Sequence, residues 1–392
     1  MIPKIKVAFF AEILIEDFDG ASRTIFQIIK SIPRDRFEFL FVCGVAPTSE
    51  FQYEVFEVPT IALPFNKSYK MAIPFFHKDI LNQKLDDFAP DVIHISTPSL
   101  LGNVGIDYSA THDIPVISIY HTHFLSYIDY YLEHFKMLVP SVKQMMVSML
   151  KKFYQQCSLI YVPTQIMISE LSKLGFSNDN MKLWPRGLDT SRFDPSKRDR
   201  NLMFSLTKNN KPNLLFASRL VWEKNLKTLT KIYNQIQYSG QEYNLIIAGD
   251  GMAIEDLKKQ MPKAFFLGKL SHDELAKFYA SSDVFVFTSI SESYGNVVAE
   301  AMASGLPCVI ANGGGSASFI DHGNNGFLCS PEDENDYLNH IKRVLGNENL
   351  RNQFINNGLE LTRDLKWQYL TETYFSDLET LASASVSLSV AV

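Results

Sequence analysis

Short runs of apolar, β-prone residues recur along the chain and alternate with longer stretches whose apolar residues follow a helical period. In the first half the runs are KVAFF from Lys6, FEFLFVCG from Phe37, DVIHIS from Asp91, PVISIY from Pro115, LIYVPT from Leu159 and MKLWPRG from Met181. Helix-like stretches such as SRTIFQIIKSI and TQIMISELSKLGF lie between them. Strands that are almost continuously apolar are typical of a parallel sheet covered on both faces, so this half predicts a doubly wound α/β domain.

A polar, proline-containing stretch at 187–213 interrupts the pattern. It has no apolar period and reads as a linker. A second series then begins with NLLFAS at Asn213, continues through YNLIIAG, AFFLG and DVFVFTS, and ends with PCVIAN from Pro307. The sequence therefore predicts two Rossmann-like α/β domains with parallel sheets, at 1–187 and 188–365. Ligands of such sheets bind beyond the carboxyl ends of the strands, so we expect the site in a cleft between the domains.

Composition narrows the class of protein. Of 392 residues, 46% are apolar and 20% are charged, which is typical of a globular protein, and the net charge of -6 argues against nucleic acid as a partner. The start is no signal peptide and no apolar run reaches the ~18 residues of a spanning helix, so we expect a cytoplasmic enzyme. The end, at 384–392, is small and mixed in polarity, and we expect a disordered tail. Four cysteines are scattered without a C-x-x-C pair and should be buried, reduced thiols: Cys43, Cys157, Cys308 and Cys329.

The stretch ISESYGNVVAEAMASG combines a loop with the start of a helix. DVFVFTS precedes it as a strand, and Glu292 and Glu300 stand eight positions apart on either side of Gly295. The first backbone N–H groups of the helix, near Gly295 to Val298, have no partner within it and favour an anion such as phosphate. The alternative is that both glutamates only complement the helix dipole.

Two cations follow another strand. Arg219 and Lys224 stand five positions apart in SRLVWEKN, directly after NLLFA. Two cations at the carboxyl end of a strand suit a diphosphate, whereas the alternative is a pair of solvated surface charges.

Two further turns carry candidate chemistry. His121 and His123 alternate in YHTHF after the strand PVISI, and the favoured interpretation places His121 against the substrate. A metal pair would need a third ligand, and a structural histidine is the other alternative. Asp19 and Gly20 form a turn between the first strand and a helix; this turn lacks the G-x-G-x-x-G of nicotinamide-binding proteins, and a metal at the D-x-D of Asp17 and Asp19 is disfavoured.

Together these motifs resemble family 4 of the retaining glycosyltransferases, whose GT-B fold has two Rossmann-like domains facing a central cleft. Glu292 and Glu300 match the E-x7-E of that family, and Arg219 and Lys224 match its diphosphate-binding pair. YHTHF is similar to its Y-H-T-[DN]-F, although His123 replaces the usual Asp or Asn. WPRGLDTSRFDP and STPSLLG resemble motifs of a subgroup that includes GDP-mannose-dependent α-mannosyltransferases and sulfoquinovosyl-diacylglycerol synthases.

The resemblance implies roles for the site residues. Glu292 would hold donor-sugar hydroxyls, Glu300 the ribose hydroxyls, and the helix start at 295–297 the phosphates. The implied catalytic residues are His121, Arg219, Lys224 and Glu292. The implied donor-binding residues are Gly20, Arg219, Lys224, Gly268, Lys269, Leu270, Glu292, Tyr294, Gly295, Asn296, Val297 and Glu300, with the base near 268–270. A final helix at about 366–383 would pack back on the first domain.

The expected activity follows from the same resemblance. It is a metal-independent, retaining transfer of a hexose from a nucleotide sugar to a lipid or glycan hydroxyl, with GDP-mannose as the leading donor and UDP-glucose, UDP-galactose or UDP-sulfoquinovose as alternatives. No cofactor beyond the donor is expected. Less favoured are a nucleotide-sugar epimerase and a non-catalytic protein that binds sugar nucleotides. The aromatic- and Met-rich segment 130–156 carries several lysines, so it could lie on the inner face of the cytoplasmic membrane or be an ordinary packed helix pair.

Overall fold

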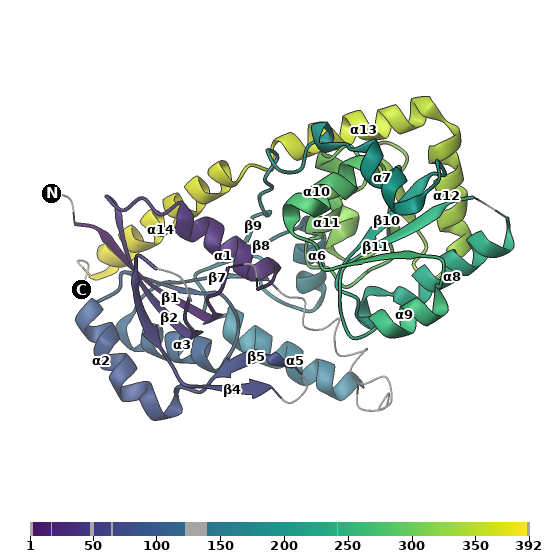
Figure 1. The fold of residues 1–392 in the computed structure, drawn as a ribbon. Coiled ribbons are helices and arrows are strands. Elements are labelled where there is room, and N and C mark those ends of the chain that lie inside the picture. The colour runs from purple at the N-terminus through teal and green to yellow at the C-terminus, as the bar shows by residue number, and fades with distance from the viewer. Residues whose placement is uncertain are drawn as a thin grey trace. The chain divides into compact units, whose positions relative to one another are not determined.

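A computed structural model describes residues 3–16, 18–47, 51–63, 66–121, 139–240 and 242–389 (Figure 1). The described residues form two compact units. Of the described residues, those up to Pro185 and the final segment from Trp367 form the first unit, and Arg186–Lys366 forms the second.

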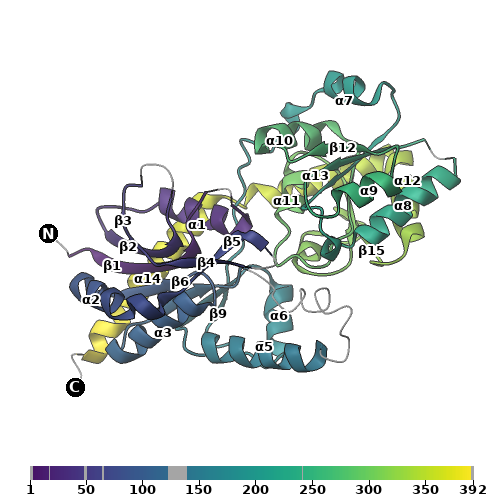
Figure 2. The ribbon, with the colours of Figure 1, turned by 60° about the horizontal axis from the view of Figure 1, so that its bottom comes forward.

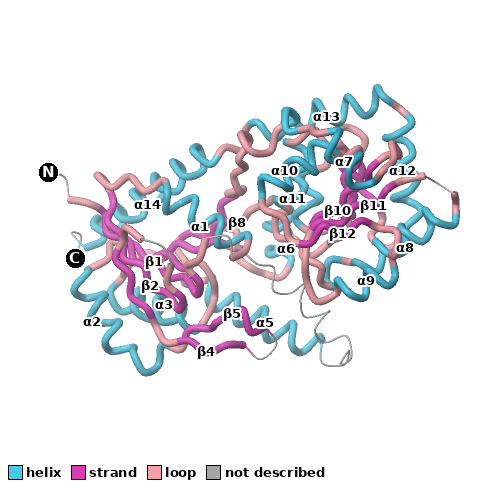
Figure 3. Tube along the Cα trace, viewed as in Figure 1, coloured by secondary structure: helices cyan, strands magenta, loops and turns pink. Residues whose placement is uncertain are grey.

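The first unit is built on a parallel sheet of seven strands in the order β3-β2-β1-β6-β7-β8-β9. Figure 3 draws the strands in magenta and labels β1, β2 and β8 of this sheet. A separate antiparallel pair joins β4 (Thr60–Leu63) to β5 (Asn66–Ala72). The strands of the main sheet are β1 (Ile5–Ile13), β2 (Phe37–Val45), β3 (Glu54–Glu57), β6 (Val92–Ile95), β7 (Val116–Ile119), β8 (Leu159–Val162) and β9 (Met181–Leu183).

Helices cover both faces of this sheet, as the near-continuous apolar strands predict. Alternate residues of β1 enter different cores: Val7 and Phe9 pack with α1 and α14, whereas Ala8 and Phe10 pack with the helices of the opposite face. Figure 2 shows α1 on one side of the strands and α2 and α3 on the other. The helices are α1 (Gly20–Lys30), α2 (Lys78–Phe88), α3 (Leu100–His112), α5 (Val139–Tyr154), α6 (Gln165–Lys173) and α14 (Trp367–Ser389), together with the short η1 (Pro74–His77).

The last helix, α14, belongs to the first unit although it follows the second in sequence. The Trp184 indole N–H donates to the carbonyl of Leu370 at 3.0 Å. His94 Nδ1 lies 2.8 Å from the Tyr374 hydroxyl, and both side chains are fully buried. The helix continues to Ser389, so residues 384–389 are helical where the sequence predicted a disordered tail.

The second unit holds a parallel sheet of six strands in the order β12-β11-β10-β13-β14-β15. This is the strand order of dinucleotide-binding sheets, and the order reverses between β10 and β13. The strands are β10 (Asn213–Ala217), β11 (Asn244–Ala248), β12 (Phe265–Gly268), β13 (Val284–Phe287), β14 (Cys308–Ala311) and β15 (Gly326–Cys329). The helices are α7 (Arg200–Thr207), α8 (Leu226–Tyr238), α9 (Ile254–Gln260), α10 (His272–Ser281), α11 (Asn296–Ala303), α12 (Glu334–Gly346) and α13 (Glu348–Arg363), with the short η3 (Pro195–Lys197), η4 (Trp222–Lys224) and η5 (Gly315–Phe319).

The predicted linker at 187–213 is an integral part of this second unit. Phe193 and Met203 are buried in its core, and Asp199 caps α7 by accepting from the N–H groups of Asn201 and Leu202. The linker interpretation was therefore wrong. Only a few apolar residues of this stretch enter the core, and they are too widely spaced to give an apolar period.

Two expectations from composition can be compared with the structure. All four cysteines are free and buried, which confirms that prediction. Among the described residues, no helix combines the length and the apolar character needed to cross a membrane.

Candidate functional site

A group of charged side chains lies where the strand order of the second sheet reverses, between β10 and β13. β10 and β13 are hydrogen-bonded neighbours, with Leu214 opposite Val284, and the loops that follow them leave the same edge of the sheet. Crevices outside the carboxyl ends of strands at such a point are the usual ligand sites of open α/β sheets. The loop after β10 carries Arg219 and Lys224, and the loop after β13 carries Glu292.

Lys224 and Glu292 form a direct ion pair across this point. The Lys224 Nζ lies 2.7 Å from Glu292 Oε1 and donates to Ser291 Oγ at 3.1 Å. The Lys224 side chain is 4% exposed and that of Glu292 is 24% exposed, so only the carboxylate reaches solvent. Burial by itself raises the pKa of Glu292, but the charge of Lys224, assisted by Arg219 and Arg186, outweighs it and leaves the pKa below its usual value. Glu292 is therefore ionised at neutral pH.

The backbone around Lys224 is fixed from two sides. Asn225 has a left-handed conformation with φ 53°, and its side-chain amide donates to the carbonyls of Thr288 and Pro331 at 3.2 and 2.8 Å. The Thr288 hydroxyl in turn donates to the Lys224 carbonyl at 3.1 Å. These bonds tie the loops after β10, β13 and β15 together, so the ammonium group is held in place by the fold.

Arg219 lies in the same loop and is the exposed cation of the group. Its guanidinium donates to Glu223 Oε1 at 3.2 Å; the Arg219 side chain is 64% exposed and that of Glu223 only 5%. Burial raises the pKa of Glu223. The loop is shaped by the turn after β11, because a Cβ at Gly249, where φ is +136°, would lie 1.8 Å from the carbonyl oxygen of Ser218.

The helix α11 begins at this site without a side-chain cap. Its first N–H groups follow Gly295, whose φ is +97°. In the described part of the chain the cap residue provides no side-chain acceptor for them, because it is a glycine. A Cβ on Gly295 would lie 2.3 Å from Ser316 Oγ, so both the backbone angle and the space require glycine. Asn296 and Val297 are partly exposed, as an anion site at a helix start requires.

A glycine-rich turn after β14 supports this helix start. The Gly315 N–H donates to the carbonyl of Glu292 at 2.6 Å. A Cβ on Gly314 would lie 2.5 Å from the carbonyl oxygen of Ile290, and one on Gly315 would lie 2.2 Å from that of Ser293. The turn therefore packs directly on the backbone that carries Glu292.

Two of the predicted donor-binding side chains are buried. Tyr294 is 3% exposed, its hydroxyl donates to the carbonyl of Arg186 at 2.8 Å, and its ring packs on Phe319. Glu300 is 5% exposed and accepts from the Tyr279 hydroxyl at 3.3 Å. The Tyr294 side chain thus supports the loop from within the core.

The other predicted residues lie in two places. Gly268, Lys269 and Leu270 are at the carboxyl end of β12, where Gly268 has φ +71° and open space around it. Gly20 and His121 lie in the first unit: Gly20 begins α1, and His121 follows β7 and is 5% exposed.

The structure describes some of the residues of the two disfavoured metal sites, the histidine pair at His121 and His123 and the D-x-D at Asp17 and Asp19. Asp19 is the N-cap of α1 and accepts from the Ser22 N–H at 2.8 Å, which explains this residue without a metal. Asp17 and His123 lie outside the described residues.

Sequence reasoning did not identify several residues that shape the site. Ser291 and Asn225 hold Lys224, and Gly313–Gly315 supports the loop of Glu292. The run GGGS directly after the strand PCVIAN was a usable signal, because a glycine-rich turn beyond a strand allows close approach of two backbones. Ser291 and Asn225 gave no such signal, since polar loop residues are common.

Two known protein families match successive parts of the chain. The family described as "Glycosyltransferase Family 4" matches residues 18–192, and the family described as "Glycosyl transferases group 1" matches residues 198–361. The chain is a glycosyltransferase with a family 4 domain and a group 1 domain. The second match covers nearly all of the second unit, and the first covers most of the first unit apart from β1 and the final segment from Trp367.

Relatives of this glycosyltransferase include enzymes of more than one specificity. A GDP-mannose-dependent α-mannosyltransferase of Corynebacterium glutamicum is 26% identical over 377 residues, which cover 94% of this chain and 87% of the relative. A sulfoquinovosyl transferase of Arabidopsis thaliana is 33% identical over 293 residues, 72% of this chain and 55% of that protein. Both subgroups that the motifs resembled are therefore represented.

Solved structures show the same fold. HepE of Anabaena in complex with UDP and glucose has a TM-score of 0.74 at 20% identity, covering 96% of this chain and 100% of that chain. Sucrose-phosphate synthase from Thermosynechococcus elongatus has a TM-score of 0.77 at 19% identity, covering 97% and 100%. The predicted GT-B fold, with its two Rossmann-like parallel-sheet domains, is confirmed.

Proposed function

We propose that this glycosyltransferase transfers a hexose from a nucleotide sugar to a lipid or glycan hydroxyl, with retention of configuration and without a metal ion. The buried Lys224–Glu292 pair beside the uncapped start of α11 carries the proposal. An ammonium group has three N–H donors, and Glu292 and Ser291 accept two of them. The remaining donor suits a phosphate oxygen, while the partly exposed carboxylate suits sugar hydroxyls.

Each part of the site has a role in this proposal. Lys224, Arg219 and the N–H groups at 295–297 bind the diphosphate, and Glu292 binds hydroxyls of the transferred sugar. Glu300 binds the ribose, and the edge of the sheet at 268–270 receives the base. From the first unit, Gly20 approaches the phosphates and His121 contacts the sugar.

Charge stabilisation is the main catalytic contribution in this mechanism. As the bond between the anomeric carbon and the phosphate oxygen breaks, negative charge grows on the diphosphate, and fixed cations and amides stabilise it without reorganising. The acceptor oxygen attacks the anomeric carbon on the face that the diphosphate leaves. Its proton passes to the departing phosphate oxygen, so configuration is retained and no covalent intermediate with the protein is required.

We propose GDP-mannose as the donor. Relatives named as GDP-mannose-dependent α-mannosyltransferases support this choice and cover most of the chain. A UDP-sugar is the second candidate, because an α-monoglucosyldiacylglycerol synthase of Streptococcus pneumoniae is 26% identical over 70% of this chain, and HepE was solved with UDP and glucose.

The acceptor and the location are part of the same proposal. The name of the S. pneumoniae relative indicates a lipid acceptor, and a lipid acceptor would bring the enzyme to the inner face of the cytoplasmic membrane. Helix α5 carries Lys143, Lys151 and Lys152 and exposes Met145 and Met149 by 57% and 60%. Residues 130–138 of the proposed membrane segment 130–156 lie outside the described residues.

A thermal-shift panel of GDP, UDP, ADP and their sugars, with and without EDTA, tests the donor. A ligand at 100 times its Kd stabilises the folded state by about 2.7 kcal/mol. We expect the largest shift with GDP-mannose, unchanged by EDTA, and a loss of that shift in Lys224→Met. A larger shift with a UDP-sugar would reassign the donor, and the absence of a shift with every nucleotide would overturn the proposed site.

A further inference from the structure

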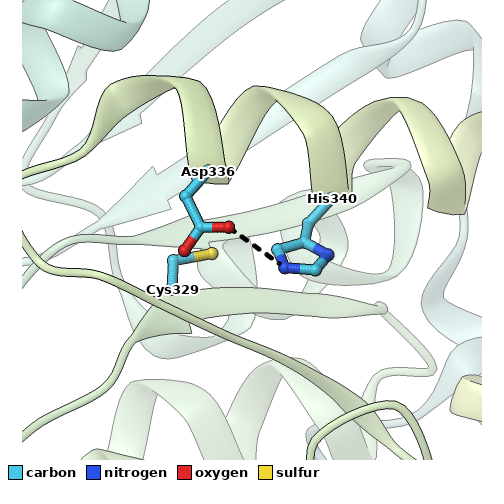
Figure 4. A group of neighbouring side chains, drawn as sticks. All are labelled: Cys329, Asp336 and His340. Atoms are coloured by element: carbon cyan, nitrogen blue, oxygen red, sulfur yellow. Dashed lines mark ion pairs between the residues drawn. The ribbon is translucent and has the colours of Figure 1, made fainter.

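A second group of reactive side chains lies at the edge strand of the second sheet, outside the proposed donor site. Cys329 ends β15, and Asp336 and His340 stand four residues apart on α12, on the side that faces this strand (Figure 4). The thiol sulfur, a carboxylate oxygen and an imidazole nitrogen all lie within 4.8 Å of one another. The proposed glycosyl transfer uses none of the three.

The three side chains are held in orientations that converge. His340 Nε2 lies 3.3 Å from Asp336 Oδ1, and Asp336 Oδ2 accepts from the Ser330 N–H at 2.8 Å. The His340 ring stacks on Phe327 with centroids 4.0 Å apart, which fixes the ring so that Nε2 points to the carboxylate. Figure 4 shows the thiol on the same side as the carboxylate and the imidazole.

The three side chains differ in how far they are exposed to solvent. Cys329 is 1% exposed, whereas the side chains of His340 and Asp336 are 11% and 30% exposed. An ion can therefore approach along the carboxylate and meet the thiol at the inner end. Thiolate, imidazole and carboxylate are the three protein ligands that Zn²⁺ accepts, and three such ligands leave a fourth tetrahedral position for water.

A neighbouring hydroxyl also indicates an additional polar group at this place. Tyr337 is fully buried, and its hydroxyl has no hydrogen-bond partner within the described part of the chain. Tyr337 directly follows Asp336 on α12. Leaving a buried hydroxyl without a hydrogen bond is unfavourable, and a metal-bound water could offset that cost.

A purely structural ion pair is the competing explanation. His340 Nδ1 lies 3.4 Å from Arg343 Nη1, so a neutral imidazole could donate from Nε2 to Asp336 and accept from Arg343. With a metal on Nε2 the proton moves to Nδ1 and this long contact with Arg343 is lost. Arg343 keeps its position over the Phe327 ring, 4.6 Å from the centroid, so little else need change.

We propose that Cys329, Asp336 and His340 bind one zinc ion. Binding replaces the thiol proton with the metal, and the proton is released to solvent. The sulfur, the imidazole Nε2 and one carboxylate oxygen become ligands, and the Asp336–His340 contact is replaced by bonds of both residues to the ion.

Zinc bound here would restrain a loop that supports the proposed donor site. Ser330 and Pro331 follow Cys329 directly, and the carbonyl of Pro331 accepts from the side chain of Asn225, the neighbour of Lys224. A metal that clamps the end of β15 to α12 therefore restrains one of the two carbonyls that hold Asn225. The ion has a positioning role, and no step of glycosyl transfer passes through it.

The test measures zinc alone, so it does not depend on the identity of the donor. The full-length protein is stripped with a chelator, loaded with Zn²⁺ and passed over a desalting column, and the bound metal is quantified by mass spectrometry. We expect about one equivalent in the wild type and less than one tenth of that in Cys329→Ser and in His340→Gln. Cobalt in place of zinc should give a thiolate-to-cobalt charge-transfer band that Cys329→Ser abolishes.

Cys308→Ser is the matched control, because Cys308 is a fully buried thiol on the neighbouring strand β14 and is not in the group. It should keep both the equivalent of zinc and the cobalt band. The proposal is overturned if the wild type retains no zinc, or if Cys329→Ser and His340→Gln, shown by circular dichroism to be folded, retain as much as the wild type. Nucleotide binding in the thermal-shift panel remains a separate measurement, so either proposal can fail alone.

Discussion

The two units have sheets of the same kind, but they differ at the helix starts that follow the two strands where the strand order reverses. In the first unit, α1 and α3 begin with side-chain caps: Asp19 accepts from the Ser22 N–H at 2.8 Å, and Ser99 accepts from the Gly102 N–H at 3.0 Å. In the second unit, α11 begins at Gly295 without a side-chain acceptor. A capped start satisfies its own N–H groups, whereas an uncapped start leaves them to a ligand.

Charged side chains near these helix starts also differ between the two units. Beside the uncapped helix, the second unit places two cations of the site and one carboxylate at the point where strand order reverses. At the corresponding end of β1 in the first unit, Glu12 is 6% exposed and accepts from the Ala72 N–H at 2.7 Å, and burial raises its pKa. At this position the first unit thus uses its polar group for an internal bond, whereas the second unit carries the charged groups for which we propose donor binding.

The largest expected effect comes from removing the carboxylate of the Lys224–Glu292 pair. Glu292→Gln keeps the shape and loses the charge, so the proposed hydroxyl contacts and the partner of a buried ammonium are weakened together. Loss of one well-placed polar group at a reacting centre typically lowers kcat by about 10²–10³-fold. Steady-state kinetics with GDP-mannose would measure this as a fall in kcat with a smaller change in KM.

Glu255→Gln is a control for the charge change alone, because that carboxylate is 72% exposed on α9 and, among the described residues, pairs with Lys258 on the same helix. It should have wild-type kinetics. Near-normal turnover in Glu292→Gln would remove Glu292 from the catalytic group and weaken the contrast between the two units.

The next effect comes from placing a side chain at the uncapped start. Gly295→Ala would combine a left-handed backbone with a Cβ 2.3 Å from Ser316 Oγ. We expect a loss of about 1–3 kcal/mol of unfolding free energy and at least a tenfold rise in the Kd for the nucleotide. Urea unfolding and calorimetric titration would measure the two quantities.

Gly323→Ala separates strain from contact, because Gly323 has φ +82° and nothing within 4 Å of the added Cβ. It should lose about 1 kcal/mol of stability and bind the nucleotide normally. Equal nucleotide affinity in both variants would show that the start of α11 is not the phosphate site.

Low pH should reduce the free energy of unfolding because the imidazole of His94 in the first unit is buried. Burial lowers the pKa of His94 to about 3. The unfolded chain therefore binds a proton at this residue below pH ~6.5 and the folded chain does not, so stability falls as pH falls from 6.5 toward 3, by up to about 1.4 kcal/mol per pH unit. Between pH 7 and pH 5 we expect a loss of about 2 kcal/mol in urea unfolding.

His94→Leu removes this proton and should reduce the pH dependence by the same amount, although the variant also loses the contact with Tyr374. An unchanged slope of stability against pH in the variant would mean that burial does not lower the pKa of His94 in the folded chain. The slope, and not the absolute stability, is the quantity to compare.

The apolar pattern was sufficient to predict the two parallel sheets and most of their strands, because a strand buried on both faces is nearly continuous in apolar residues. It did not predict β3, β4 or β5, whose residues are largely polar or partly exposed, nor the role of 187–213 in the second core. The Glu292 loop and the Lys224 loop were found from their positions after strands. Ser291, Asn225 and the group at Cys329 could not be found, because their roles depend on contacts between distant segments.

The smallest effect concerns a cap in the first unit. Asp19→Ala removes the acceptor for the Ser22 N–H, and loss of such a cap typically costs about 1 kcal/mol. The substitution turns the start of α1 into an uncapped one like that of α11, but without the neighbouring Lys224 and Arg219. If charges and an open helix start are both needed, the variant should lose stability in urea and gain no affinity for inorganic phosphate. Asp19→Asn, which keeps an acceptor, should restore most of the stability, and tighter phosphate binding by Asp19→Ala would show that an open helix start alone makes the anion site.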